Sequence, residues 1–323
     1  MKILFVHNRL TSFVRQDLEC LRQVHQVSEL HVSSRRLNPA AIWRQVEAHD
    51  VVFGWFASWH TALPVLFARC LKRPSVLVVG GYDLANLPSI GYGHQRGGLK
   101  KWVSRATMRL ANALVTNSHF SEREAKSNAG LGDRRLRVIY HGIKDSFGEI
   151  PAAPREPMAI TIGNVDRPNL HRKGLEPFVR AAGFLPHVKF VVIGDWKGDA
   201  IEHLRRIASS NVEFTGWVEE NTLLNYCRRA SVYVQASRHE GFGMAVAEAM
   251  LAGCIPVVTK DGALPEVVGD CGVYSSAEPH AIAEGIRQAM SLPEENRARA
   301  RQRVLSQFSL QKRRVLLAEA IAG

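Results

Sequence analysis

The sequence predicts an α/β protein made of two doubly wound, Rossmann-like domains. Its 323 residues exceed what one hydrophobic core usually holds, so two domains are expected. Short apolar segments rich in β-branched residues alternate with segments of helical periodicity along the whole chain. This alternation is typical of parallel sheets with helices on both faces. Ligands of such sheets bind at the carboxyl ends of the strands, where functional residues are therefore sought.

The first half of the chain predicts one complete α/β domain, residues 1–150. The helix expected near residue 121 begins with Ser121 and Glu124, which fit the spacing of a capping box. Strands are expected at 2–8, 27–32, 50–56, 74–81, 113–118 and 135–142, and helices at 13–24, 99–114 and 121–128.

A second α/β domain is expected at 151–300, after a linker at 150–157 that has three prolines and no periodicity. The remaining residues, 301–323, are expected to form a helix that packs back toward the first domain. Strands are expected at 158–164, 188–195, 212–218, 231–237, 255–260 and 272–276, and helices at 174–185, 200–210, 222–230, 243–253 and 293–322.

The net charge of +12 is concentrated in the first half of the chain. Residues 1–150 hold 21 Lys and Arg against 11 Asp and Glu, whereas residues 151–323 hold 21 against 19. A field of this sign attracts phosphates, an anionic membrane surface or nucleic acid, or simply improves solubility. The five scattered cysteines contain no C-x-x-C pair, so neither a disulfide framework nor a zinc site is expected. The apolar stretch at the start is short for a secretory signal, so a cytoplasmic location is expected.

One carboxylate interrupts an otherwise apolar helix. Around Glu248 the sequence MAVAEAMLA is apolar or small on every side, and such a helix is expected to be buried. A buried carboxylate costs several kcal/mol without a partner. The partner is either a buried basic side chain or a pair of ligand hydroxyls, such as those of a ribose.

The turn before this helix predicts a site for a nucleotide sugar. Gly241 and Gly243 allow a ligand close to the backbone, and the free N–H groups of a helix N-terminus favour phosphate. Glu240 suits a neutral, hydroxyl-rich group there. A dinucleotide fingerprint with Asp261 as the ribose acid is a rival interpretation, which Val246 at the place of the third glycine disfavours.

The segment Glu240–Glu248, followed by AMLAGCIPVVTKDGALPEVVGDCGVY, resembles the signature of the retaining glycosyltransferases of family 4, also called group 1. FTGWV at 214–218, LLNYCRRASVYVQAS at 223–237, IYHGI at 139–143 and RKG at 172–174 follow the order of that family. The resemblance implies the GT-B fold, in which two doubly wound domains face each other across a cleft. It also implies a nucleotide-sugar-dependent hexosyltransferase, with the acceptor side in the first domain and the donor side in the second.

The resemblance also implies roles for individual residues. Glu248 would hold the ribose hydroxyls and Glu240 would face the transferred sugar. Backbone amides of Gly241, Phe242, Gly243 and Met244 would hold sugar and phosphate oxygens, and the backbone of Thr215, Gly216 and Trp217 would take the edge of the base.

The family uses a lysine and an arginine to neutralise the diphosphate leaving group. Lys173 matches the lysine. The place of the arginine is taken by Asn164, so Arg172 or, as the alternative, Arg167 is expected to reach the phosphates. No D-x-D pair occurs in the chain, which argues against a bridging metal ion, and no cofactor is expected.

On the acceptor side, Asp83 follows a predicted strand and is expected to be catalytic or to orient the acceptor, with a turn or N-cap role as the alternative. His141 is a candidate contact to the sugar or phosphate, whereas His60 is expected to be structural. The helix at 99–114 has one basic and one apolar stripe, so it is expected either to lie on an anionic membrane surface or to pack on the core.

The predicted function is retaining transfer of a sugar to a glycan, lipid-linked or small-molecule acceptor, with peripheral contact with the inner face of a membrane as a further hypothesis. An epimerase or hydrolase of nucleotide sugars with the same fold stays open, as does an inactive homologue that senses sugar nucleotides. A nucleic-acid-binding protein is the alternative from another class. It is disfavoured because the charge is diffuse and no helix-turn-helix, zinc or RNA-sheet motif is present, so no nucleic-acid partner is expected.

Overall fold

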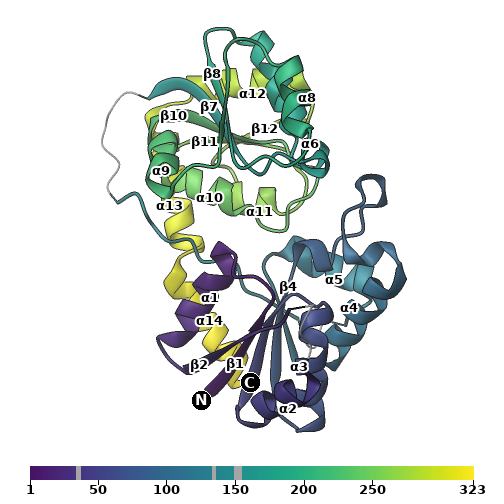
Figure 1. The fold of residues 1–323 in the computed structure, drawn as a ribbon. Helices are drawn as coiled ribbons and strands as arrows, with labels where there is room; N and C mark the ends of the chain where they lie inside the picture. The colour runs from purple at the N-terminus through teal and green to yellow at the C-terminus, as the bar shows by residue number, and fades with distance from the viewer. Residues whose placement is uncertain (34–37, 133–135, 149–154) are drawn as a thin grey trace. The chain divides into compact units, whose positions relative to one another are not determined.

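The computed structural model describes residues 1–33, 38–132, 136–148 and 155–323 (Figure 1). The chain divides into two compact units. Unit 1 comprises Met1–Gly142 together with Leu310–Gly323, and unit 2 comprises Ile143–Ser309. Each unit contains one six-stranded parallel sheet.

In unit 1 the strand order is β2-β1-β3-β4-β5-β6. The inner strands β1, β3 and β4 are buried almost throughout, because helices cover both faces of the sheet. The strands are β1 (Lys2–His7), β2 (Gln26–His31), β3 (Val51–Trp55), β4 (Ser75–Val79), β5 (Ala113–Thr116) and β6 (Leu136–Val138). The helices are α1 (Ser12–Arg22), α2 (Pro39–Glu47), α3 (Trp59–Cys70), α4 (Gly98–Leu110), α5 (His119–Ala129) and α14 (Leu310–Ala322), with short 3₁₀ turns η1 (Gly81–Asp83), η2 (Pro88–Ile90) and η3 (His94–Arg96).

A buried ion pair joins the C-terminal helix of unit 1 to its first helix. Arg313 on α14 donates two hydrogen bonds to Asp17 on α1, at 2.5 and 2.6 Å, and both side chains are at most 1% exposed. Arg313 also donates to the carbonyls of Ile139 and Tyr140, while Trp55 donates to Asp17. Every charge in this cluster is therefore hydrogen-bonded, as burial requires.

In unit 2 the strand order is β12-β11-β10-β7-β8-β9. The strands are β7 (Glu156–Ile162), β8 (Lys189–Ile193), β9 (Val212–Gly216), β10 (Ala230–Gln235), β11 (Ile255–Val258) and β12 (Val273–Tyr274). The helices are α6 (Arg167–Arg172), α7 (Leu175–Ala181), α8 (Ala200–Ile207), α9 (Glu220–Arg229), α10 (Met244–Leu251), α11 (Leu264–Val268), α12 (Pro279–Ser291) and α13 (Glu294–Gln307), with the 3₁₀ turn η5 (Ala182–Phe184).

The strand order of unit 2 reverses between β7 and β10. From β7 the chain proceeds outward through β8 and β9, then returns to β10 on the other side of β7 and proceeds through β11 and β12. With right-handed crossovers, the helices that follow β7 and β10 therefore lie on opposite faces of the sheet. Open α/β sheets bind their ligands at such a switch point.

Several elements differ from the sequence-based predictions. Helices α2, α3, α6, α11 and α12 were not predicted. The predicted capping box at Ser121 is wrong, because α5 begins at His119 and Ser118 is its N-cap, accepting the N–H of Ser121.

The predicted domain limits also differ from the observed division. The chain divides after Gly142 and after Ser309, instead of after residues 150 and 300, because α13 continues to Gln307 and packs against α10 within unit 2. Most of the predicted linker, 150–154, lies outside the described residues. None of the helices in the described part of the chain combines the length and apolar character needed to cross a bilayer.

Candidate functional site

Glu248 lies on α10, the helix that follows β10 at the switch point of unit 2. Among the residues that the structure describes, no hydrogen bond or ion pair reaches its carboxylate. Burial raises the pKa of Glu248 to about 7, and the neighbouring carboxylate of Glu220 raises it further. The basic partner that would have explained this residue structurally is therefore not found, and its carboxylate is available for a ligand.

Glu240 and Lys173 meet at the carboxyl edge of β7 and β10. The Nζ atom of Lys173 lies 3.7 Å from Oε2 of Glu240, and both side chains are mostly buried. The side-chain amide of Gln235, at the end of β10, donates a hydrogen bond of 2.7 Å to the same oxygen. The amide oxygen Oε1 of Gln235 in turn accepts from the hydroxyl group of Tyr233. Gly163, after β7, leaves room for the lysine, because a Cβ atom there would lie 2.9 Å from Cδ of Lys173.

The loop between Glu240 and α10 is held close to a second loop. Gly243, the N-cap of α10, has φ of +105°, which glycine tolerates best. Gly262 packs against Glu240 so closely that a Cβ atom would lie 2.5 Å from the Glu240 carbonyl oxygen, and Ala263 donates to that oxygen. The side chain of Phe242 is buried against Phe308, whereas Met244 begins the helix and is half-buried. The loop is thus fixed by packing, with its main chain at the switch point.

The two arginines that are candidates for binding the diphosphate have different surroundings. Arg172 is half-buried on α6, where it donates to Asn169 and to the carbonyl of His239, next to Glu240. Arg167 is exposed and forms a bidentate ion pair with Asp199. Of these two, Arg172 is the one that lies beside the Glu240 loop.

The segment predicted to take the base lies at the end of β9. Thr215 and Gly216 close this strand, and Trp217 is 71% exposed just beyond it. The carbonyl of Gly216 accepts the N–H of Gly194, which holds the ends of β8 and β9 together. This segment is on the carboxyl edge of the sheet, two strands away from β7.

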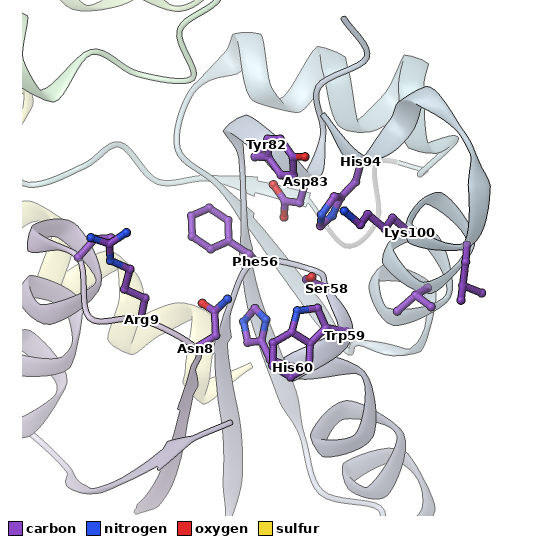
Figure 2. A pocket seen from close by; sticks show the side chains of 13 residues that line it. Asn8, Arg9, Phe56, Ser58, Trp59, His60, Tyr82, Asp83, His94 and Lys100 are labelled. Atoms are coloured by element: carbon purple, nitrogen blue, oxygen red, sulfur yellow. The ribbon is translucent and has the colours of Figure 1, made fainter. Parts of the chain in front are cut away.

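Unit 1 contains a pocket of about 660 Å³ at the carboxyl ends of β1, β3 and β4 (Figure 2). In this view Arg9 and Lys100 approach it from opposite sides, with Phe56 between them. Phe56 has φ of +65°, a strained conformation for a residue with a side chain. The pocket is lined by Asn8, Arg9, Thr11, Phe56, Ser58, Trp59, His60, Tyr82, Asp83, His94, Leu99, Lys100 and Val103.

Asp83 joins two loops beside this pocket. One carboxylate oxygen accepts the N–H of Ala57 and the other accepts that of Gly80, both at 2.9 Å. The residue is 1% exposed, and burial raises its pKa to about 7. Through these two hydrogen bonds Asp83 stabilises the turn that follows β4. A turn role of this kind is the alternative to the expected catalytic role.

Both histidines of unit 1 considered above are buried. His60 donates from Nε2 to the Trp55 carbonyl at 2.8 Å, and burial lowers its pKa to about 4, in keeping with a structural role. His141 stacks on the Trp55 ring with centroids 5.7 Å apart, and its Nε2 lies 3.2 Å from the amide nitrogen of Asn117. Burial, followed by the charge of Arg313, lowers the pKa of His141 well below 6.5, so the ring is neutral.

Sequence reasoning missed the residues that position Glu240. Gln235 and Tyr233 belong to a strand that is buried along its whole length. A buried glutamine needs hydrogen-bond partners, so this polar residue at the end of a strand was a usable signal. Gly163 gave no comparable signal, since its role depends on the path of the Lys173 side chain.

Two protein families match this chain. Residues 10–147 match the family described as Glycosyltransferase Family 4, and residues 156–291 match the family described as Glycosyl transferases group 1. Together these matches cover most of both units.

Individual relatives are more distant. The chain is 30% identical over 110 residues to the GDP-mannose-dependent alpha-(1-6)-phosphatidylinositol dimannoside mannosyltransferase of Mycobacterium tuberculosis, covering 33% of this chain and 29% of that protein. It is 27% identical over 285 residues to a glycogen synthase of the same species, covering 79% of this chain and 67% of that protein. The chain spans about half or less of the length of the first curated relatives that it matches.

The fold is shared with solved structures. Anabaena Alr3699/HepE in complex with UDP and glucose superposes with a TM-score of 0.81 at 16% identity, with all of both chains covered. A glycosyltransferase from Rickettsia africae superposes with a TM-score of 0.78 at 16% identity, covering 99% of this chain and 97% of that chain. The predicted fold class, α/β with GT-B architecture, is confirmed.

Proposed function

We propose that this chain transfers a sugar from a nucleotide-diphosphate sugar to an acceptor. The chain belongs to the group 1 (family 4) glycosyltransferases. The observation that carries the proposal is the carboxylate of Glu248, which is unpartnered among the described residues and lies on the helix that follows the switch point. Two vicinal ribose hydroxyls would donate to it and replace the water it loses on burial. The complex of the structural neighbour with UDP and glucose supports a donor of this class.

The remaining groups suit the departure of a diphosphate. Cleavage of the bond between the sugar and the phosphate develops negative charge on the leaving group, and fixed cations and N–H donors stabilise that charge. Lys173, and Arg172 beside the Glu240 loop, would supply the cations, while the amides of Gly241–Met244 would supply the donors. Because the sequence has no D-x-D pair, the proposal assigns this task to side chains and backbone and to no metal ion.

Glu240 would contact the transferred sugar. Its oxygen Oε2 is held by Gln235 and faces Lys173, so its position is fixed before a ligand binds. A carboxylate fixed in this way accepts hydrogen bonds from sugar hydroxyls with little loss of conformational freedom. Retention at the anomeric carbon is part of the proposal and rests on the resemblance to the family. A cytoplasmic location is a further part of the proposal.

A thermal-shift panel of UDP-, GDP- and ADP-sugars tests the donor. A donor at a hundred times its Kd should stabilise the protein by roughly 2.7 kcal/mol. Glu248→Ala should lose this shift, because the ribose then loses its acceptor. Glu220→Gln is the matched control, since it removes the neighbouring carboxylate but no proposed ligand contact, and it should keep the shift.

Two outcomes of the thermal-shift panel would contradict the proposal. Either no nucleotide sugar stabilises the protein, or Glu248→Ala retains the full shift of the wild-type protein. With the donor identified, product analysis over a set of acceptors then separates transfer from hydrolysis or epimerisation of the donor.

A further inference from the structure

Helix α4 of unit 1 exposes two large apolar side chains. Leu99 is 78% exposed and Trp102 is 67% exposed, and Ala106, one turn further, is exposed as well. The buried side of the same helix consists of Ser104, Thr107 and Met108. Met108 on this side belongs to the core, so the apolar residues Leu99 and Trp102 are exposed in addition to the buried face that a surface helix normally has. We call Leu99, Trp102 and Ala106 the α4 stripe.

The chain around the α4 stripe is basic and contains no acid. Between Asp83 and Glu122 the sequence has five Lys and Arg residues and no Asp or Glu. Lys100 is exposed, and Lys101 is half-buried on the next position of the helix. Arg105 is turned inward, donating to Gln95 and to the carbonyl of Asn128, so it belongs to the packing of the unit. The two lysines next to Leu99 and Trp102 provide the positive charge at the N-terminal end of the helix.

A bilayer with anionic headgroups fits both properties of this surface. Exposed Leu and Trp side chains beside lysines are typical of helices that lie in the membrane interface, where apolar groups enter the acyl boundary and ammonium groups meet lipid phosphates. A nucleic acid would use the lysines but would leave Leu99 and Trp102 without a function. A second copy of this chain would present the same positive charge to itself.

The α4 stripe is continuous with the pocket of unit 1. Leu99 belongs to both, and Val103 of the same helix also lines the pocket. Lys100, the third lining residue of this helix, is labelled in Figure 2. Among the lining residues the one carboxylate is Asp83, both of whose oxygens accept backbone N–H groups. Arg9 and Lys100 therefore dominate the charge of the pocket. An anionic headgroup suits these two cations, and the rings of Phe56, Trp59 and Tyr82 suit the apolar faces of a sugar or lipid.

We propose that the α4 stripe docks this chain on an anionic membrane surface, and that the adjoining pocket takes its acceptor as a membrane lipid with a phosphate-bearing headgroup. The second part rests on the proposed function; the first does not. Docking places the pocket beside the lipid headgroups, so the acceptor can be reached without leaving the bilayer.

Co-sedimentation with vesicles tests the docking. Vesicles of phosphatidylcholine with phosphatidylglycerol should bind the wild-type protein, and vesicles of phosphatidylcholine alone should not. The double variant Leu99→Gln/Trp102→Gln should bind about tenfold or more weakly, because the apolar area that enters the bilayer is removed. Lys100→Gln and Lys101→Gln should each weaken binding roughly fivefold at low salt.

Phe184→Gln is the matched control. It replaces an aromatic side chain that is 49% exposed on unit 2, and its vesicle binding should equal that of the wild-type protein. Unchanged thermal midpoints of the α4 variants without vesicles establish that these variants are folded. Unaltered vesicle binding by the folded Leu99→Gln/Trp102→Gln variant would overturn the docking. So would salt-sensitive binding of the wild-type protein to RNA but not to vesicles, or a dimer in solution that Trp102→Gln dissociates.

The acceptor needs a separate measurement. Transfer to phosphate-bearing lipids in vesicles should exceed transfer to their water-soluble headgroups, and Arg9→Gln should reduce it while the donor-induced thermal shift stays. Faster transfer to the soluble headgroup would overturn the lipid acceptor. A missing donor shift together with normal vesicle binding would instead contradict the proposed function and leave the docking intact.

Discussion

The carboxylate of Glu248 is costly in the protein without ligand. Burial raises its pKa from 4.5 to about 7, because the half-buried carboxylate loses part of its hydration and gains no partner from the residues that the structure describes. A bound diol would donate hydrogen bonds to the carboxylate and so offset its loss of hydration. Ligands that lack the diol would not, and the site would therefore select ligands that carry it. Strain of this kind is common at functional sites, where it is offset by the stability of the surrounding fold.

Stability should depend on pH through Glu248. The unfolded chain loses this proton near pH 4.5 and the folded protein near pH 7, so the folded state becomes less stable as pH rises through this range. Glu248→Gln removes the effect and should stabilise the unliganded protein at pH 8 by up to about 3 kcal/mol, with no gain at pH 4. Urea unfolding at several pH values measures this difference. Equal stability of the variant and the wild-type protein at pH 8 would contradict the expectation.

At the scale of elements, the basic helix α13 serves the fold of unit 2. Arg297 donates to the carbonyls of Ser231 and Gly253, Arg301 to that of Leu251, and Arg303 to those of Glu266 and Val267. Several of these carbonyls lie at the C-terminal ends of α10 and α11, where backbone acceptors lack partners within the helix. The arginines of α13 therefore stabilise α10 and α11, the helices around the proposed donor site.

Replacing a capping arginine of α13 should destabilise unit 2. Arg297→Ala leaves two buried carbonyls without donors and should lower the free energy of unfolding by about 2–4 kcal/mol. Arg299→Ala should cost less than about 1 kcal/mol, since Arg299 pairs with Asp270 in solvent. Denaturant unfolding of both variants gives the comparison. A similar decrease in the free energy of unfolding in the two variants would show that the hydrogen bonds from Arg297 to backbone carbonyls do not stabilise unit 2 more than an exposed ion pair does.

The local sequence predicts most of these elements but missed five helices, of which α2 and α12 do have one buried apolar face. The buried strands and α10 are apolar stretches, and the Glu240–Glu248 segment is distinctive enough to indicate the family and to nominate a candidate donor site. Helix α3 was missed because it is apolar on several sides and contains Pro64, and α6 because it has only six residues. Contacts of Glu240 with Gln235 and Lys173 depend on three-dimensional packing, so the sequence offered candidates for the site without their arrangement.

At the scale of the whole molecule, unit 1 depends on the last residues of the chain. The ion pair of Asp17 with Arg313 joins positions 296 residues apart, a separation that no local pattern reveals. The sequence therefore predicted two domains and a returning helix from composition and resemblance, whereas the division after Ser309 required the structure.

Breaking this ion pair should unfold unit 1 more easily. Arg313→Met leaves the buried carboxylate of Asp17 without a cation, with the Trp55 N–H as its donor, and should cost about 3–5 kcal/mol. The double variant Asp17→Leu/Arg313→Met should recover part of the loss. Arg314→Met, on the neighbouring and more exposed position, is the control. Hydrogen exchange of the β1 and β3 amides localises the effect to unit 1. Protection of these amides that is unchanged in Arg313→Met would contradict the role of the pair.

The return of α14 to unit 1 has a consequence for biosynthesis. A ribosome completes the contiguous residues of unit 2 while the unit made first still lacks its final helix, and domains generally fold as units as they emerge. Unit 1 is thus begun before unit 2 but completed after it. Until α14 has been synthesised, the surface around Asp17 and Trp55 stays uncovered, and a chain that stops before Leu310 has a complete unit 2 and a unit 1 that lacks this helix.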